Sequence, residues 1–258
     1  MATVTDSEPW VRAVRASHDR LSGIVAGLDA DGLRQQSYAK EWSIADVLSH
    51  LGSGAEIFLL SIDAGVAGGD PPGTEAYQPI WDTWNARSPQ QQAAQSLVAN
   101  EALVTRVESL TPAQREAFSV VMFGAMTMDL AGLLGTRLSE HAVHTWDVAV
   151  VLDADARLAP DAVDLMIGGL SMIIGFTGKK QETPAVIAVT TTSPDRTFTL
   201  DTGGVTLAPG DPEAAAGASM VLSAEAFIRL VYGRLDDEGE ITAAGVTLPG
   251  LRAVFPGF

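Results

Sequence analysis

Residues 137–149 read RLSEHAVHTWDVA, and this stretch decides how the first half of the chain folds. It lies within a longer segment, from about Thr127 to Leu152, whose apolar residues recur at the spacing of a helix. Glu140 and His144 are four positions apart, so they lie on one helix face, one turn from each other. Asp147, three positions further on, lies on the same flank. The stretch therefore predicts a helix with a polar flank beside its apolar face.

Upstream of this helix the sequence predicts three more, which together suggest a four-helix bundle. The second of them opens at Ser43, with Asp46 three positions later in the pattern of a capping box. A stretch rich in glycine and proline, Gly65 to Gly73, predicts a loop after it. The first helix is expected over Trp10 to Leu28 and the third over Pro89 to Leu110, beginning earlier near Trp81 as an alternative, with a short turn at Thr111-Pro112.

The pattern changes near residues 153–160, where we expect a domain boundary. We therefore predict a bundle over residues 1–155 and a small α+β domain over 156–258. β-branched residues and a Gly203-Gly204 turn indicate a mostly antiparallel sheet in the second domain. Its expected strands are Ala185 to Thr192, Thr197 to Leu200, Val205 to Ala208, Ala218 to Leu222 and Ile241 to Val246, with helices over Asp161 to Gly178, Ser223 to Tyr232 and Leu248 to Val254.

Composition excludes several classes of function. The chain has 258 residues, a net charge of −16 and 47% hydrophobic residues, which suits a globular protein with a real core. An acidic surface disfavours nucleic acids and anionic membranes, which both require clustered Lys and Arg. Met1 to Pro9 lacks the features of a signal peptide, and the apolar stretch Leu165 to Phe176 is too short and glycine-rich for a membrane span. We therefore expect a cytoplasmic protein.

The chain contains no cysteine, so a metal site has to be built from His, Asp or Glu. His50 lies off the apolar stripe of the second helix, as Glu140 and His144 do on the fourth, and the two flanks can converge between the helices. Two imidazoles and one carboxylate suit zinc and leave its fourth position open, as in catalytic sites. Asp147 is then expected to orient a ligand imidazole or a water.

Other interpretations of these residues stay open. A Glu and a His four positions apart on a helix often form only a surface contact. His141 falls on the apolar centre of its helix, which favours a hydrogen-bonded core residue, although it is the natural substitute ligand. Arg137 lies one turn before Glu140 and can also touch the site. His18 is most simply a solvated helix residue, and Trp42 and Trp146 are most simply packing residues.

Three segments of the chain resemble one known family. Residues 41–51, EWSIADVLSHL, look like the signature of DinB-like metal-binding bundles, and residues 137–149 look like a segment of the mycothiol-dependent maleylpyruvate isomerase family. Residues 223–235, SAEAFIRLVYGRL, are similar to that family's closing helix and its Gly-Arg pair. The resemblance implies a DinB-like four-helix bundle followed by a small α+β domain similar to sterol carrier proteins.

The resemblance also implies a function and a set of site residues. The family's zinc ligands correspond to His50, Glu140 and His144, and its functional C-terminal arginine corresponds to Arg234. It implies an enzyme that uses mycothiol and a divalent metal, most simply zinc, either as a cis-trans isomerase or as an S-transferase acting on an electrophile. Arg234 is then expected to bind a substrate carboxylate in the interdomain cleft, or alternatively to serve as a helix-terminal charge.

A binding protein is the alternative from another class: a carrier of a small molecule or lipid, with a structural metal in its bundle. The expected partners are a small thiol and an electrophile, not nucleic acid or membrane, and the protein is expected to be a monomer or homodimer. Sequence does not name the substrate, and His2Glu sites also accept other divalent ions.

Overall fold

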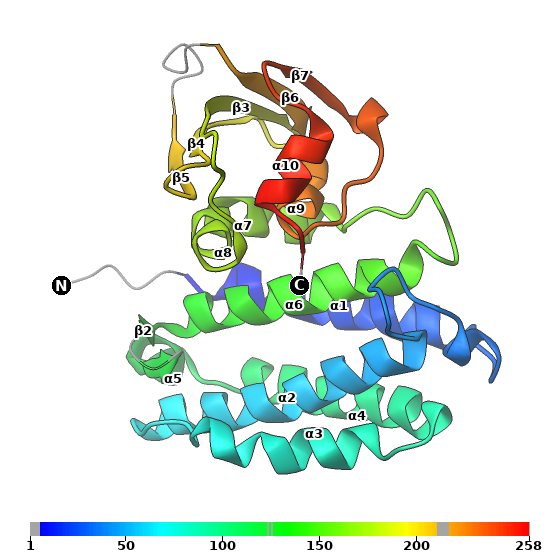
Figure 1. Ribbon diagram of the computed structural model, residues 1–258. Helices are drawn as coiled ribbons and strands as arrows, with labels where there is room; N and C mark the ends of the chain where they lie inside the picture. The colour runs from blue at the N-terminus through cyan, green and yellow to red at the C-terminus, as the bar shows by residue number, and fades with distance from the viewer. Residues whose placement is uncertain (1–5, 123, 125, 211–216, 258) are drawn as a thin grey trace. The chain divides into compact units, whose positions relative to one another are not determined.

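The computed structural model describes residues 6–122, 124, 126–210 and 217–257, so the first five positions of the polar N-terminal stretch lie outside the described residues. The chain divides into two compact units, residues 1–157 and 158–258. The first unit is helical, and the second combines helices with a five-stranded sheet, as Figure 1 shows. The α+β fold class is confirmed.

Four long helices build the first unit: α1 (Glu8–Val25), α2 (Ile44–Ala67), α4 (Pro89–Glu108) and α6 (Leu130–Ala149). Helix α2 packs on α4 and α6, and α1 packs on the same two neighbours, which closes a four-membered bundle (Figure 1). Its core is aliphatic and includes Leu21, Leu48, Leu51 and Val148, each fully buried. Burial of these side chains is the main stabilising contribution to the bundle.

The capping box predicted at Ser43 is confirmed. The Ser43 hydroxyl accepts a hydrogen bond from the Asp46 amide at 3.2 Å, and the Asp46 carboxylate accepts one from the Ser43 amide at 2.9 Å. At its other end α2 stops at Gly68, whose φ of 70° lies in the left-handed region that favours glycine. The predicted loop therefore begins later than Gly65, because a glycine inside a helix does not by itself end it.

Two predicted boundaries are wrong in the first unit. The segment near Trp81 forms a separate short helix, α3 (Gln78–Asn85), rather than an early start of α4. A Cβ at Gly52 of α2 would lie 2.2 Å from the Trp84 ring, so the glycine is what allows α3 to pack this closely. The segment around Thr127 forms a hairpin, β1 (Val120–Met122) and β2 (Met126–Met128), and α6 starts only after its N-cap, Asp129.

The remaining short elements of the first unit connect its long helices. The turn predicted at Thr111-Pro112 is a short helix capped by Thr111. These elements are η1 (Gly32–Arg34), η2 (Thr74–Ala76) and α5 (Pro112–Ala117).

In the second unit the sheet has the strand order β5-β4-β3-β6-β7. Only the β3–β6 pair is parallel, so the expected, mostly antiparallel sheet is confirmed. The side chains of Phe227 and Leu230 on α9 are fully buried. The bounds are β3 (Val186–Thr192), β4 (Arg196–Asp201), β5 (Thr206–Pro209), β6 (Ser219–Ser223), α9 (Ala224–Val231), η5 (Glu238–Glu240), β7 (Ile241–Ala244) and α10 (Leu248–Val254).

The single helix expected over Asp161 to Gly178 is interrupted. It consists of α7 (Pro160–Met166), a 3-10 turn η3 (Ile167–Gly169) and α8 (Leu170–Thr177), and two adjacent glycines occupy the interruption. Pro160–Thr177 as a whole has 18 residues and a mean hydropathy of 1.2, which passes the length and composition test for a membrane span. Core helices of soluble proteins pass the same test, so it is weak evidence for a membrane.

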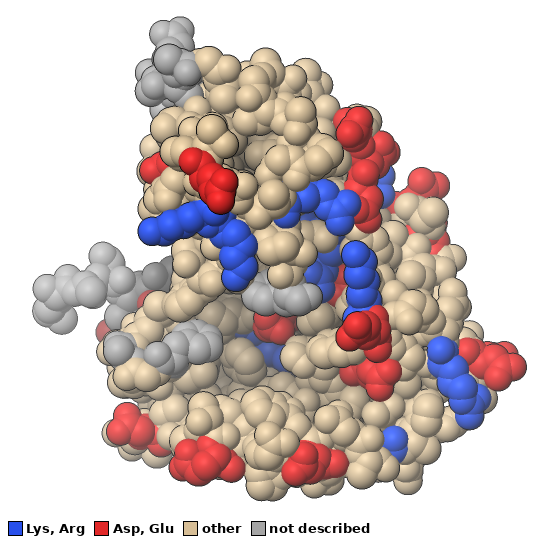
Figure 2. Space-filling model, viewed as in Figure 1, with Lys and Arg blue, Asp and Glu red and all other residues tan. Residues whose placement is uncertain are grey.

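Figure 2 shows both acidic and basic side chains on one face of the molecule, with mainly Asp and Glu along its lower edge, which belongs to the first unit.

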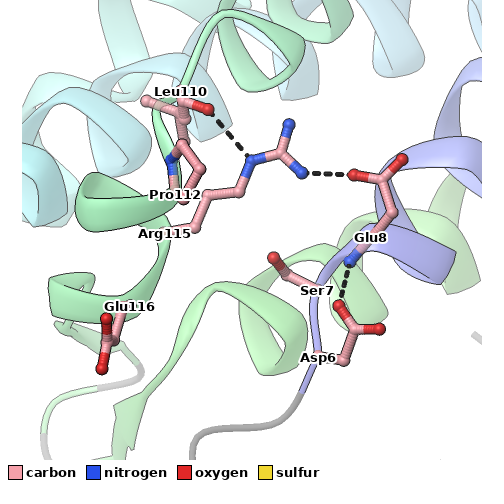
Figure 3. A pocket seen from close by; sticks show the side chains of 7 residues that line it. All are labelled: Asp6, Ser7, Glu8, Leu110, Pro112, Arg115 and Glu116. Atoms are coloured by element: carbon pink, nitrogen blue, oxygen red, sulfur yellow. Dashed lines mark hydrogen bonds and ion pairs between the residues drawn. The ribbon is translucent and has the colours of Figure 1, made fainter.

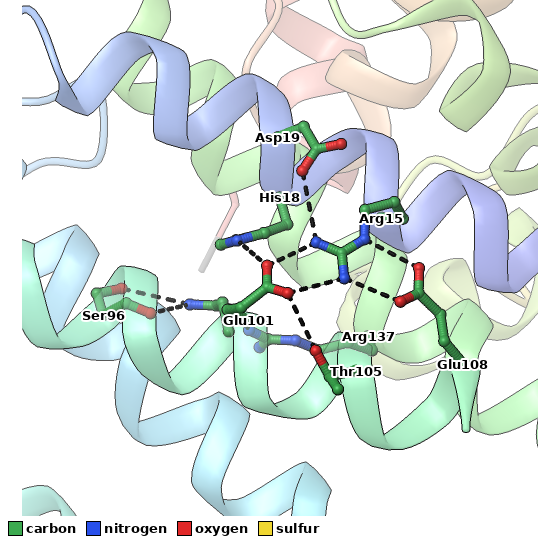
Figure 4. A network of polar contacts seen from close by, with 9 residues as sticks. Arg15, His18, Asp19, Ser96, Glu101, Thr105, Glu108 and Arg137 are labelled. Atoms are coloured by element: carbon green, nitrogen blue, oxygen red, sulfur yellow. Dashed lines mark hydrogen bonds and ion pairs between the residues drawn. The ribbon is translucent and has the colours of Figure 1, made fainter. Parts of the chain in front are cut away.

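A polar network joins α1 to α4, as Figure 4 shows. Arg15 donates to both carboxylates of Glu101 and Glu108 at 2.6–3.0 Å, and its hydrogen bonds hold the pKa of Glu101 down at about 2. His18 Nε2 lies 3.1 Å from Glu101. The expectation that His18 is solvated is wrong: only 5% of it is exposed, because α1 turns this side toward α4.

Burial lowers the pKa of His18, against the opposing charge of Glu101, and this predicts a pH dependence of stability. His18 takes up a proton at lower pH in the folded protein than in the unfolded chain, where its pKa is about 6.5, so stability falls as pH decreases through that value. Urea unfolding of metal-free protein measures this between about pH 7 and 5. The free energy of unfolding should fall by up to about 1.4 kcal/mol per pH unit more in wild type than in His18→Gln. Equal slopes in the two proteins would contradict this origin.

Candidate metal centre

Helices α2 and α6 bring His50, Glu140 and His144 together. His50 Nε2 lies 3.2 Å from Glu140 Oε2, and His144 Nε2 lies 3.9 Å from the same oxygen. One ligand atom from each residue falls within 4.8 Å of the others, and no other metal-competent cluster is found among the described residues. Each of the three side chains is partly exposed, so the cluster is open to small molecules.

The donor set and its spacing fit a tetrahedral zinc ion. Two ligand atoms that each lie 2.0–2.1 Å from such an ion are about 3.3 Å apart. The His50–Glu140 separation of 3.2 Å is close to this value, and the His144–Glu140 separation of 3.9 Å needs only a small side-chain adjustment. Three protein ligands leave one position of the tetrahedron for a ligand from solution.

Asp147 orients one of the imidazoles. Its Oδ2 lies 2.8 Å from His144 Nδ1, and the carboxylate is completely buried one turn further along α6. An ionised carboxylate accepts hydrogen bonds, so His144 Nδ1 carries the proton and Nε2 presents its lone pair toward Glu140. Asp147 thus lies against an imidazole of the cluster, and its role in orienting a metal ligand stays a prediction.

Trp42 forms a wall of the cluster, which the sequence analysis missed. Its ring stacks on His144 with centroids 5.8 Å apart and contacts the His50 ring at 5.1 Å. Glu41 just before it has a φ of 71°, a left-handed conformation that non-glycine residues rarely adopt. The position of Trp42 directly before the N-cap Ser43 could have signalled this role, because it holds the ring close to the start of the helix that carries His50.

The charges around the cluster favour an ionised Glu140. Burial alone would raise its pKa, but the His50 hydrogen bond and the charges of His144, His50 and Arg137 outweigh it and hold the pKa at about 2. Glu140 is therefore a carboxylate at neutral pH, the form that binds a cation.

His141 lies outside the cluster. It is 1% exposed, and its Nδ1 lies 2.8 Å from the Ser17 hydroxyl of α1. The core interpretation is the one the geometry supports, since the chain packs this face of α6 against α1. Trp146 likewise packs, with its indole donating to the Ala156 carbonyl at 3.0 Å.

Arg234 belongs to the second unit, directly after α9. It is 6% exposed, and its Nη1 donates to the carbonyl of Tyr232. The Arg234 carbonyl in turn accepts from Arg229, at 3.3 Å.

The cavities of the first unit lie elsewhere. One of about 600 Å³ is lined by Asp6, Glu8, Arg115 and Glu116 among others, and Figure 3 shows Arg115 bonded to Glu8 and to the Leu110 carbonyl. Because that arginine is already paired, this cavity offers no free cation. Another of about 550 Å³ is lined mainly by apolar side chains of α1 and the end of α6.

Comparisons with known proteins point in one direction. A family model described as the mycothiol maleylpyruvate isomerase N-terminal domain matches residues 14–149. A crystal structure of the mycothiol-dependent maleylpyruvate isomerase superposes with a TM-score of 0.68 at 15% identity, covering 94% of this chain and 95% of that one. A histidine-to-alanine mutant of that enzyme superposes equally, with a TM-score of 0.68 at 14% identity. Such identities show a shared fold. No curated protein sequence matches significantly.

The Asp147–His144 contact predicts how the cluster responds to mutation. Asp147→Asn keeps the shape but removes the acceptor charge, so zinc affinity should fall about 10- to 100-fold. A competition titration against a chromophoric chelator measures this. Asp164→Asn, at an exposed position of α7, is the control and should leave the affinity unchanged. Equal affinities of the Asp147 variant and wild type would contradict the orienting role.

Proposed function

This chain belongs to the mycothiol maleylpyruvate isomerase N-terminal domain family, and on that premise we propose that it is an enzyme in which mycothiol or a similar small thiol adds to an electrophile. The observation that carries the proposal is the convergence of His50, Glu140 and His144 within the matched domain. These three residues are proposed to hold one divalent metal ion, most simply zinc.

The absence of cysteine sharpens this proposal. A soft sulfur donor is a favoured ligand of zinc, and the chain has none of its own apart from methionine. The sulfur at the open position is therefore proposed to come from the thiol. A bound divalent ion would supply the positive charge that turns this thiol into a thiolate at neutral pH.

The surrounding side chains prepare the site for such a ligand. Asp147 holds His144 in the tautomer that leaves Nε2 free, and Glu140 supplies one negative charge. The indole of Trp42 lies against both imidazoles and limits the directions in which they can tilt. Together they fix the two rings before a ligand arrives, which lowers the ordering cost of binding.

A thiolate in this position supports two related reactions. Its sulfur forms a bond to one carbon of a cis double bond conjugated to a carbonyl, and the electron pair of that bond moves toward the carbonyl oxygen. The former double bond is now single, so its two carbons can rotate relative to each other. The electron pair then returns and the carbon–sulfur bond breaks, which releases the thiolate and the trans isomer. Protonation of the adduct at carbon leaves a thiol conjugate instead. The family favours isomerisation, and an S-transferase is the variant of the same chemistry.

We propose that Arg234 contributes to substrate binding, on its match to the family's functional arginine. Its planar guanidinium suits a carboxylate. Because the side chain is 6% exposed and bonded to the Tyr232 carbonyl, such a role requires an N–H group of Arg234 to reach the substrate.

The proposal predicts metal-dependent thiol chemistry. Zinc-loaded full-length protein should isomerise or conjugate members of a panel of cis-enone carboxylates in the presence of mycothiol. His144→Ala removes a ligand atom and should lower the rate at least about 100-fold, together with the bound zinc. His18→Gln changes a histidine outside the cluster and serves as the control.

Proton NMR separates the reactions, because an isomerase regenerates mycothiol while a transferase consumes it. Turnover no faster than with metal-free protein, at full zinc occupancy, would contradict the enzyme and favour a non-catalytic binding protein.

A further inference from the structure

Arg137 is a buried cation whose hydrogen bonds, among the residues that the structure describes, go only to neutral oxygens. It extends from α6, one turn before Glu140, and only 2% of it is exposed. Its Nη2 donates to the carbonyl of Leu51 at 2.9 Å and to the side-chain oxygen of Asn100. Its Nε has no partner, and Nη1 makes no hydrogen bond within the described part of the chain. Three of its five N–H donors are thus unused.

An arrangement of this kind is unfavourable unless an anion completes it. Two neutral oxygens do not neutralise a guanidinium, and the charge of Glu140 offsets the cost of burying it only in part. Burial lowers the pKa of Arg137 to about 10, opposed by the charge of Glu140, so the side chain remains protonated at neutral pH. If Arg137 served only for packing, an apolar side chain of similar volume would fill the same space at a lower free-energy cost.

Gly54 leaves space beside one nitrogen of this guanidinium, on the side that faces α2. A Cβ at this partly buried glycine would lie 3.0 Å from Arg137 Nη1, so any other residue would cover that nitrogen. Gly54 follows His50 by one turn of α2, as Arg137 precedes Glu140 by one turn of α6. The open nitrogen and the His50–Glu140 pair therefore lie on neighbouring turns of the same two helices. The ring of Phe58 lies 5.5 Å from the guanidinium carbon, one turn further along α2.

We propose that Arg137 and Gly54 form an anion subsite next to the metal cluster, where Nη1 binds the carboxylate of a ligand whose reacting end lies at the cluster. Apart from the backbone of α2 itself, Nη1 is the one atom within 4 Å of the Cβ position of Gly54, so a carboxylate oxygen placed there would lie at hydrogen-bond distance from Nη1. The inference rests on the proposed function, since the cluster positions the other end of the ligand. The carboxylate belongs either to the thiol or to its electrophile.

Cobalt-loaded full-length protein tests the subsite without turnover, because sulfur binding to cobalt gives a charge-transfer absorption band. The probes are 3-mercaptopropionate, which carries a carboxylate, and 2-mercaptoethanol, which does not. Arg137→Met removes the cation. Gly54→Ala keeps it but covers Nη1; the helix propensity of alanine opposes the cost of shifting Nη1 by a few tenths of an ångström, and a thermal melt checks that the variant is folded. Gly23→Ala in α1, where a Cβ would meet nothing within 4 Å, is the matched control.

If the thiol carries the carboxylate, wild type and Gly23→Ala should bind 3-mercaptopropionate at least about tenfold more tightly than 2-mercaptoethanol. The preference should disappear in Arg137→Met and Gly54→Ala, with 2-mercaptoethanol binding unchanged. If the electrophile carries it, succinate should instead bind to the 2-mercaptoethanol complex of wild type and Gly23→Ala, and at least about tenfold more weakly to the other two variants.

Either result supports the subsite. Absence of both preferences in wild type, or their persistence in Gly54→Ala and Arg137→Met, would overturn it while the metal–thiol proposal stands. Absence of any charge-transfer band with 2-mercaptoethanol would contradict the proposed function, and carboxylate binding measured by calorimetry would then decide the subsite alone.

Discussion

The approach of His50 to Glu140, 3.2 Å apart and 90 positions apart in sequence, is the contact on which the site depends. It joins α2 to α6, whose packing is sparse compared with that of α2 on α4. Aliphatic burial holds the other faces of these helices, so the polar flanks are free to face each other. A bundle with a full apolar seam between α2 and α6 would have no room for a cluster.

The cluster could be predicted because helical periodicity fixes which residues share a face. Glu140, His144 and Asp147 follow from spacing along one helix, and Ser43 fixes where the helix of His50 begins. Periodicity showed only that the flanks of the two helices can converge, and the family resemblance then supported the same three residues. Trp42 and His18 show what helical periodicity does not predict. The loop before α2 turns Trp42 onto the imidazoles, and α4 buries His18, both through contacts between segments distant in sequence.

Fold boundaries failed where local and tertiary effects compete. The helix expected from Thr127 begins only at Leu130, because the preceding residues pair as a hairpin that a hydrophobic pattern does not distinguish from a helix end.

Glycine acts differently at different positions. Gly52 and Gly54 lie inside α2 without ending it, one admitting the ring of Trp84 and the other exposing a nitrogen of Arg137, whereas Gly68 ends the same helix.

The central claim is that three protein ligands hold a metal whose fourth ligand is the sulfur of a small thiol. X-ray absorption at the zinc edge tests it directly on the full-length, zinc-loaded protein. Without thiol, the account predicts only nitrogen and oxygen neighbours near 2.0–2.1 Å, and with mycothiol one added sulfur near 2.3 Å. A spectrum that shows no sulfur at saturating thiol, or zinc that His50→Ala and His144→Ala do not displace, would contradict it.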